Sequence, residues 1–188
     1  MVIIMTKAEK ITVAGFGGQG VMTLGQIIAH AGAQTNLNSL WYPSYGPETR
    51  GGTANCAVIV SPQPINSPVF ARADALMALN KPSLDRFCDK VAVGGKILYN
   101  ASLIDEVSSR ENIEIYGVPI NDIADSLGNL RVANMVMLGA YLELSPIFTD
   151  EVINNVLRDF LGAKKESLLA INLEAIKMGK EHIREVRK

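Results

Sequence analysis

The segment that most constrains the fold of this chain is GFGGQG, which runs from Gly15 to Gly20. It follows the apolar run KITVA and precedes VMTLGQIIAHAG, in which apolar residues recur at helical spacing. Glycines in this G-x-G-x-x-G pattern permit positive φ angles and a close approach of the backbone to a phosphate. The pattern predicts a tight turn from a buried strand into a helix whose first N–H groups can bind an anion.

Strands and helices alternate along the first two thirds of the chain. We expect strands at residues 10–16, 53–61, 74–80, 96–100 and 113–119, helices at 21–34 and 81–91, and a turn at Gly94 and Gly95. The strand at 53–61 follows a loop with no intervening helix, which indicates one antiparallel pair. The fold class predicted is therefore α/β, a three-layer Rossmann-like domain with a mostly parallel, mixed sheet.

The C-terminal part has a helical pattern. Residues 131–144 are apolar on nearly all sides, which predicts a helix enclosed by its neighbours. Thr149 stands where an N-cap is expected for a helix at 150–161. We expect a single domain over 1–188, with an N-terminal tail at 1–9, a sheet-forming part at 10–120 and a mainly helical part at 121–188.

Composition excludes several classes of function. The net charge of −1 gives no reason to expect a nucleic acid or an anionic membrane as partner. Cys56 and Cys88 each stand alone, so the chain cannot supply an iron–sulfur or zinc quartet, and no metal ligand is predicted. The start, MVIIMTK, has only five consecutive apolar residues, too few for a signal peptide or a membrane span. We expect a cytoplasmic protein.

The distribution of charge is uneven. No Lys, Arg, Asp or Glu occurs in the 37 residues from Ile11 to Pro47. Free protein surface normally carries charge, so such a stretch is either core or surface covered by another protein.

The glycine motif alone does not establish a dinucleotide site. A Rossmann unit also needs an Asp or Glu about 20 residues further on to bind the ribose hydroxyl groups. The first acidic residue here is Glu48, which lies too far along the chain and beyond two prolines. An autonomous NAD-dependent oxidoreductase is therefore disfavoured. A free-standing module that uses the turn as an anion site stays an alternative.

A second unusual segment, YPSYGPETRGGTANCAVIVS, covers residues 42–61. Its aromatic, arginine and glycine residues are expected to form a loop at the same edge of the sheet as the glycine turn. Such a loop is either a recognition surface or a long ordered connection. The residues concerned are Tyr45, Gly46, Pro47, Glu48, Arg50, Gly51 and Gly52.

Together, GFGGQG, the segment at 42–61 and ALNKPS at 78–83 resemble the gamma subunit of 2-oxoacid:ferredoxin oxidoreductases. The resemblance runs from about Lys10 to beyond residue 144. It implies a non-catalytic subunit of a complex that decarboxylates a 2-oxoacid, with 2-oxoglutarate favoured, forms an acyl-CoA and reduces ferredoxin. The implied partners are alpha, beta and ferredoxin-like delta subunits, which would carry thiamine diphosphate, Mg and [4Fe-4S] clusters.

The resemblance also implies roles for the two loops. The segment from Tyr45 to Gly52 would be an interface with a catalytic subunit, with Arg50 as its anchor. The glycine turn would either bind a phosphate of coenzyme A at that interface or only shape the chain. The residues of this candidate phosphate loop are Gly15, Gly17, Gly18, Gln19 and Gly20. No catalytic residue is expected in this chain.

Overall fold

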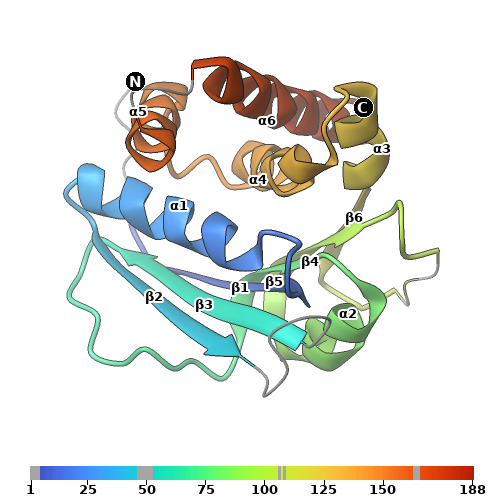
Figure 1. Ribbon diagram of the computed structural model, residues 1–188. Coiled ribbons are helices and arrows are strands. Elements are labelled where there is room, and N and C mark those ends of the chain that lie inside the picture. Colours follow the sequence, from blue (N-terminus) through green and yellow to red (C-terminus); the bar gives the residue numbers. More distant parts are fainter. Residues whose placement is uncertain (1–4, 46–52, 106, 108, 163–165) are drawn as a thin grey trace.

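The structure is a computed structural model that describes residues 5–45, 53–105, 107, 109–162 and 166–188. A six-stranded sheet of order β2-β3-β1-β4-β5-β6 forms its centre (Figure 1). The strands are β1 (Glu9–Phe16), β2 (Asn38–Tyr45), β3 (Thr53–Ser61), β4 (Ala73–Ala78), β5 (Val91–Asn100) and β6 (Glu114–Val118).

Helices cover both faces of the sheet. They are α1 (Val21–Gln34), α2 (Lys81–Phe87), α3 (Ile120–Ser126), α4 (Ala133–Leu144), α5 (Asp150–Leu161) and α6 (Glu166–Val186), with short 3-10 helices η1 (Cys88–Lys90) and η2 (Leu130–Val132). In Figure 1, α1 lies on one face together with α3 to α6, and α2 lies on the other face. None of the described helices is long and apolar enough to cross a membrane.

The strand directions confirm the predicted mixed sheet. β1, β4, β5 and β6 run parallel, whereas β3 is antiparallel to both β1 and β2. β2 is absent from the predicted strands, because it contains Pro43, which has no N–H group for a strand ladder. β2 is an edge strand, where a proline is tolerated.

The prediction of a turn at Gly94 and Gly95 is wrong. β5 already begins at Val91 and includes both glycines, and its register with β4 shifts between Ala73 and Ala75. Gly94 has a φ of 77°, and a Cβ on Gly95 would lie 2.8 Å from the carbonyl oxygen of Asp74. The glycine pair therefore forms an irregularity within a strand, which short-range sequence patterns do not distinguish from a turn.

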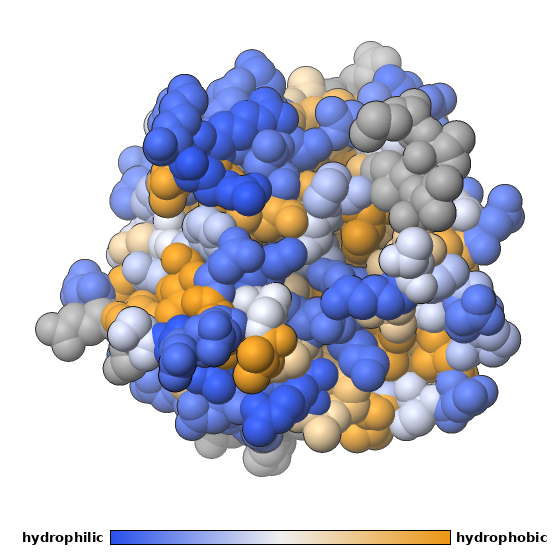
Figure 2. All heavy atoms as spheres, turned by 180° about the vertical axis from the view of Figure 1, so that it is seen from behind, coloured by the Kyte–Doolittle hydropathy of each residue, from blue (hydrophilic) through white to orange (hydrophobic). Residues whose placement is uncertain are grey.

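Part of the uncharged stretch is core. Within its described part, residues 11–45, large side chains such as Ile11, Leu24, Ile27 and Ile28 are at most 1% exposed. Other residues of the stretch are exposed, among them Thr23 and His30 on α1 and Tyr42 on the outer strand β2, which is 50% exposed. Seen from behind in Figure 2, hydrophobic patches alternate with hydrophilic residues, and no single apolar surface covers that face.

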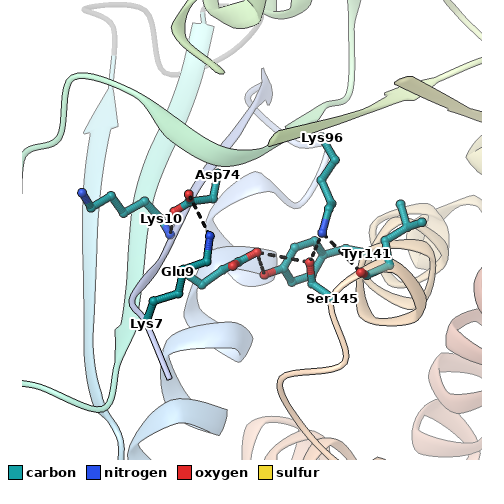
Figure 3. A network of polar contacts seen from close by, with 8 residues as sticks. Lys7, Glu9, Lys10, Asp74, Lys96, Tyr141 and Ser145 are labelled. Atoms are coloured by element: carbon teal, nitrogen blue, oxygen red, sulfur yellow. Dashed lines mark hydrogen bonds and ion pairs between the residues drawn. The ribbon is translucent and has the colours of Figure 1, made fainter. Parts of the chain in front are cut away.

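A polar network joins the start of β1 to the end of α4 (Figure 3). The Glu9 carboxylate accepts hydrogen bonds from the Tyr141 hydroxyl at 3.3 Å and the Ser145 hydroxyl at 3.1 Å. The Lys96 ammonium group donates to the Ser145 hydroxyl at 2.9 Å. Burial and the nearby Glu9 raise the pKa of Tyr141 well above its usual value. The phenol therefore stays a neutral hydrogen-bond donor, and the network anchors α4 over the sheet.

Two glycines set the packing of α4 against α6. α4 is buried on almost all sides, as predicted, and the described part of α6 crosses it where Gly139 faces Gly179. A Cβ on Gly139 would overlap with the carbonyl oxygen of Ile176, and one on Gly179 with that of Val136. The two backbones therefore approach more closely than any side chain would allow.

We expect Gly179→Ala to lower the free energy of unfolding by about 3 kcal/mol, because two helix backbones must move apart. Alanine would otherwise stabilise a helix interior by about 1 kcal/mol, so the sign of the change is diagnostic. Urea unfolding of the Gly179→Ala and Glu181→Ala proteins measures the effect, and the exposed change Glu181→Ala is the control. A Gly179→Ala protein as stable as the control would contradict the close contact.

Candidate functional site

The glycine turn joins β1 to α1 as predicted. Gly18 and Gly20 have φ angles of 98° and 79°, which only glycine adopts without strain. Gly20 is the N-cap residue of α1, and no side chain caps this helix. The first turn of α1 contains no acidic residue. The N–H groups at this helix end therefore keep their capacity to bind an anion.

The side chain of Gln19 fastens the turn to the end of β4. Its Oε1 accepts hydrogen bonds from the N–H of Phe16 at 2.7 Å and from the Asn80 amide at 3.3 Å. Its Nε2 donates to the carbonyl oxygen of Leu79 at 3.2 Å. The backbone N–H of Gln19 donates to the Phe16 carbonyl. Gln19 therefore shapes the turn from within.

Further side-chain amides form hydrogen bonds along the carboxyl edge of the parallel strands. Asn100, which is fully buried, donates through Nδ2 to the carbonyl oxygen of Leu79 at 3.3 Å and to Oδ1 of Asn121 at 2.9 Å. Asn80 caps α2 by accepting from the N–H of Ser83. These side chains bind one another, so the edge between β1 and β6 is a rigid support for the turn.

The topology disfavours a dinucleotide site. In a Rossmann unit, the strand that follows the first helix lies next to the first strand and brings its acidic residue to the turn. Here β3 lies between β1 and β2 and runs antiparallel to both. The carboxyl end of β2 is thus one strand away from the glycine turn, in addition to lacking an acidic residue.

A cavity of about 410 Å³ opens beside the turn. It is formed by the start of α1 and by η2, α4, α5 and α6. The lining residues are Gly18, Gly20, Thr23, Ile27, Arg131, Asn134, Met135, Leu157, Phe160, Leu161 and Asn172. No Asp or Glu occurs among these described residues, and Arg131 contributes a positive charge. The cavity therefore favours a ligand that is both partly apolar and anionic.

Asn134 connects the turn to α4. Its side chain is 7% exposed, and its Nδ2 donates to the carbonyl oxygen of Gly20 at 3.4 Å. A Cβ on Gly20 would overlap with this amide, so Gly20 is required by packing as well as by φ. Arg131 and Asn134 are not among the predicted site residues, because they lie more than a hundred residues from the turn in a segment with the pattern of a core helix.

The structure brings part of the second predicted loop to the same edge. β2 ends at Tyr45 and β3 begins at Thr53, which pairs with Phe16 next to the glycine turn. Residues 46–52, which include Gly46, Pro47, Glu48, Arg50, Gly51 and Gly52, lie outside the described residues. Their role as an interface stays a prediction.

Neither Cys56 nor a metal cluster supplies reactive chemistry among the described residues. Cys56 is 1% exposed and packs near the Trp41 indole, and burial raises the pKa of its thiol to about 12. It is thus a neutral core residue at physiological pH. No group of three or more His, Cys, Asp or Glu side chains in the described ranges could hold a metal ion.

Replacing Gln19 tests its structural role. Gln19→Leu has a similar size but leaves the buried Leu79 carbonyl and the Phe16 N–H without this partner, so we expect a loss of about 2–3 kcal/mol in unfolding free energy. Gln34→Leu, which removes one exposed hydrogen bond to Asp159, should cost less than about 1 kcal/mol. Urea unfolding distinguishes the two. Equal losses would contradict the assigned role of Gln19.

Comparison with known proteins identifies the family. A family model described as pyruvate ferredoxin/flavodoxin oxidoreductase matches residues 10–182. The ketoisovalerate oxidoreductase subunit VorA of Methanothermobacter thermautotrophicus is 41% identical over 94% of this chain, which spans 36% of that relative. The 2-oxoglutarate synthase subunit KorC of Methanocaldococcus jannaschii is 33% identical over 87% of this chain and 90% of its own length.

Comparison with solved structures gives the same family. The 2-oxoglutarate:ferredoxin oxidoreductase of Magnetococcus marinus, solved with 2-oxoglutarate, coenzyme A and succinyl-CoA bound, matches with a TM-score of 0.87 and 31% identity, over 96% of this chain and 32% of that chain. The gamma subunit of a keto/oxoacid ferredoxin oxidoreductase from Geobacter sulfurreducens matches with a TM-score of 0.79 and 28% identity, over 94% of this chain and 99% of its own. The chain thus spans about a third of the VorA and Magnetococcus chains. It belongs to the pyruvate ferredoxin/flavodoxin oxidoreductase family, in which it corresponds to the gamma subunit.

Proposed function

We propose that this chain is a non-catalytic gamma subunit of an enzyme that oxidatively decarboxylates a 2-oxoacid, forms an acyl-CoA and reduces ferredoxin. The observation that carries the proposal is the family match over residues 10–182 together with the close fold of the Magnetococcus enzyme. The alternatives of an autonomous NAD-dependent enzyme and a free-standing anion-binding module are not favoured, because neither accounts for this match.

The chemistry is assigned to partner subunits. The chain has only two cysteines, and one of them, Cys56, is enclosed in the core. A [4Fe-4S] cluster needs four thiolates, so the clusters, and with them thiamine diphosphate and Mg, belong to alpha, beta and ferredoxin-like delta chains. Thiamine diphosphate bound there would supply the electron sink for decarboxylation. The two free cysteines also favour the reducing environment of the cytoplasm.

The contribution of this chain is to bind coenzyme A by its phosphate end. The N-terminus of α1 lacks a capping side chain, and the exposed Gly18 lies at the mouth of the cavity. Backbone N–H groups at a helix start bind phosphate without any charged side chain. Gly15 and Gln19 support the turn, since a Cβ on Gly15 would lie 2.8 Å from Oε1 of Gln19.

We favour 2-oxoglutarate as the substrate of the complex. Part of the Magnetococcus enzyme has the same fold, and that enzyme was solved with 2-oxoglutarate bound, while KorC is a subunit of 2-oxoglutarate synthase. Ketoisovalerate is the second candidate, because VorA is 41% identical to this chain. Assays of the purified complex with both acids distinguish the two candidates. A higher kcat/KM for ketoisovalerate than for 2-oxoglutarate would make ketoisovalerate the substrate.

Assembly of the complex tests the proposal as a whole. When the tagged chain is purified from its native host, we expect thiamine- and cluster-binding chains to come with it, together with 2-oxoacid- and CoA-dependent reduction of ferredoxin. Arg50→Ala should leave the melting temperature of the isolated chain unchanged but reduce its incorporation, because truncating a central interface arginine commonly costs about 2 kcal/mol. Recovery of the chain alone, with no such partners, would contradict the proposal.

Two exposed glycines with positive φ provide a matched test of the turn. Gly18→Val and Gly128→Val introduce the same kind of backbone strain, with φ angles of 98° and 71° and no atom within 4 Å of the added Cβ. Only Gly18 lies at the cavity. We expect Gly18→Val to raise the KM for coenzyme A about tenfold, without a change in the KM for the 2-oxoacid. The same KM values in both variants would contradict phosphate binding at the turn.

A further inference from the structure

The exposed residues of the uncharged stretch gather mainly on β2 and on the segment that leads into it. They are Ala33, Gln34, Asn36, Asn38, Tyr42 and Ser44. β2 is the outermost strand of the sheet (Figure 1), so its other edge has no strand partner among the described residues. Natural edge strands are usually protected by charged side chains, whereas residues 38–45 contain none. An uncharged edge of this kind indicates a surface that another strand covers.

The hydrogen bonds of the sheet determine which backbone groups of β2 face outwards. The carbonyl oxygen of Ala14 accepts from the N–H of Leu79 on the β4 side, so the even-numbered residues of β1 face β4. Successive residues of a strand point their backbone groups to opposite sides. Carried through the registers of β1 with β3 and of β3 with β2, this alternation turns Ser39, Trp41 and Pro43 to the open edge. The position of Pro43 agrees, because a strand proline belongs where its nitrogen faces solvent.

These outward groups are complementary to a second copy of the same edge. An antiparallel pair centred on Leu40 places Ser39 opposite Trp41 of the second copy, where each residue donates one hydrogen bond and accepts one. Pro43, which has no N–H, then lies opposite Leu37, whose N–H is already bonded within its own chain at 3.1 Å. Shifting the pair by two residues in either direction leaves a carbonyl group of Ser39 or Trp41 without a donor. The backbone therefore specifies one two-fold register.

The side chains around this register are free of charge. Leu40 would lie directly opposite its own copy on the outer face of the sheet, and Tyr42 would lie opposite Asn38. A two-fold contact brings identical residues together near the axis, so a charged residue there would repel its own copy. α1 continues the neutral surface, since it contains no Lys, Arg, Asp or Glu and is bonded to β2 through the Ser39 hydroxyl, which donates to the carbonyl oxygen of Ala29 at 2.7 Å.

We propose that two copies of this chain pair through β2, antiparallel and centred on Leu40, so that their two sheets join into one continuous sheet. The symmetry axis is perpendicular to the sheet, which places α1 of both copies on the same face. The inference explains why exposed residues of the stretch carry no charge. It does not depend on the proposed function, and within a complex the same contact joins two sets of subunits.

The mass of the full chain in solution tests the pairing. Sedimentation velocity over a concentration series should show a dimer with twice the chain mass of 20.3 kDa. Leu40→Lys and Leu40→Glu each place like charges opposite one another, so we expect dissociation constants at least about tenfold higher. An equimolar mixture of the two variants should restore the dimer, because lysine then faces glutamate. The control is Val93→Lys, which adds the same charge at an exposed position of β5.

A second variant tests the edge without a change at Leu40. Ser39→Pro removes an outward N–H and leaves the hydrogen bonds between β2 and β3 in place, so we expect a monomer with the circular dichroism of the wild type. Its control is Ser39→Ala, which also loses the hydroxyl bond to Ala29 but keeps the N–H and should stay dimeric.

Several results would overturn the proposal. One is a wild-type chain that is monomeric throughout the series, and another is a dimeric Ser39→Pro protein. Folded Lys and Glu variants whose mixture stays monomeric would exclude the two-fold register. A monomeric chain whose Leu40→Lys variant is lost from the assembled complex would assign the edge to a strand of a different subunit. A dimer that recruits no other subunits would contradict the proposed function and leave this inference intact.

Discussion

The hydrogen bonds of the Gln19 side chain hold the glycine turn in place, and the arrangement of the candidate site depends on them. Gln19 joins the turn to Leu79 and Asn80 at the end of β4, and Asn134 contacts it from α4. The turn is thus held by the sheet on one side and by α4 on the other. As a result, the N-terminus of α1 has a fixed position relative to the cavity.

The glycines of the motif serve different physical purposes. At Gly15 a Cβ would collide with the Gln19 amide, and at Gly20 it would collide with the Asn134 amide. Packing therefore requires glycine at both positions. Gly18 has open space around it and needs only a positive φ. The motif therefore includes two glycines that packing requires, Gly15 and Gly20, and one exposed glycine with open space around it, Gly18.

Local patterns were sufficient to predict α1, the enclosed helix α4 and the Thr149 cap, which accepts a hydrogen bond from the N–H of Val152. They failed where a distant part of the chain decides the outcome. The strand at 38–45 exists because β3 pairs with it, and Gly94 and Gly95 lie within a strand because β4 and β5 shift in register. Arg131 and Asn134 become site residues only because α4 packs over the turn, which no nearby residue reveals.

The position of β3 distinguishes this turn from that of a dinucleotide-binding unit. In a Rossmann unit, the space beside the turn is bordered by a parallel neighbour whose acidic residue selects a ribose with free hydroxyl groups. Here an antiparallel strand occupies that place, and the start of β3 is neutral there. On the opposite side of the turn, α4 and η2 supply an amide and an arginine instead of a carboxylate. A guanidinium attracts a phosphate that a carboxylate would repel, so the charge beside this turn is opposite in sign to that of a dinucleotide site.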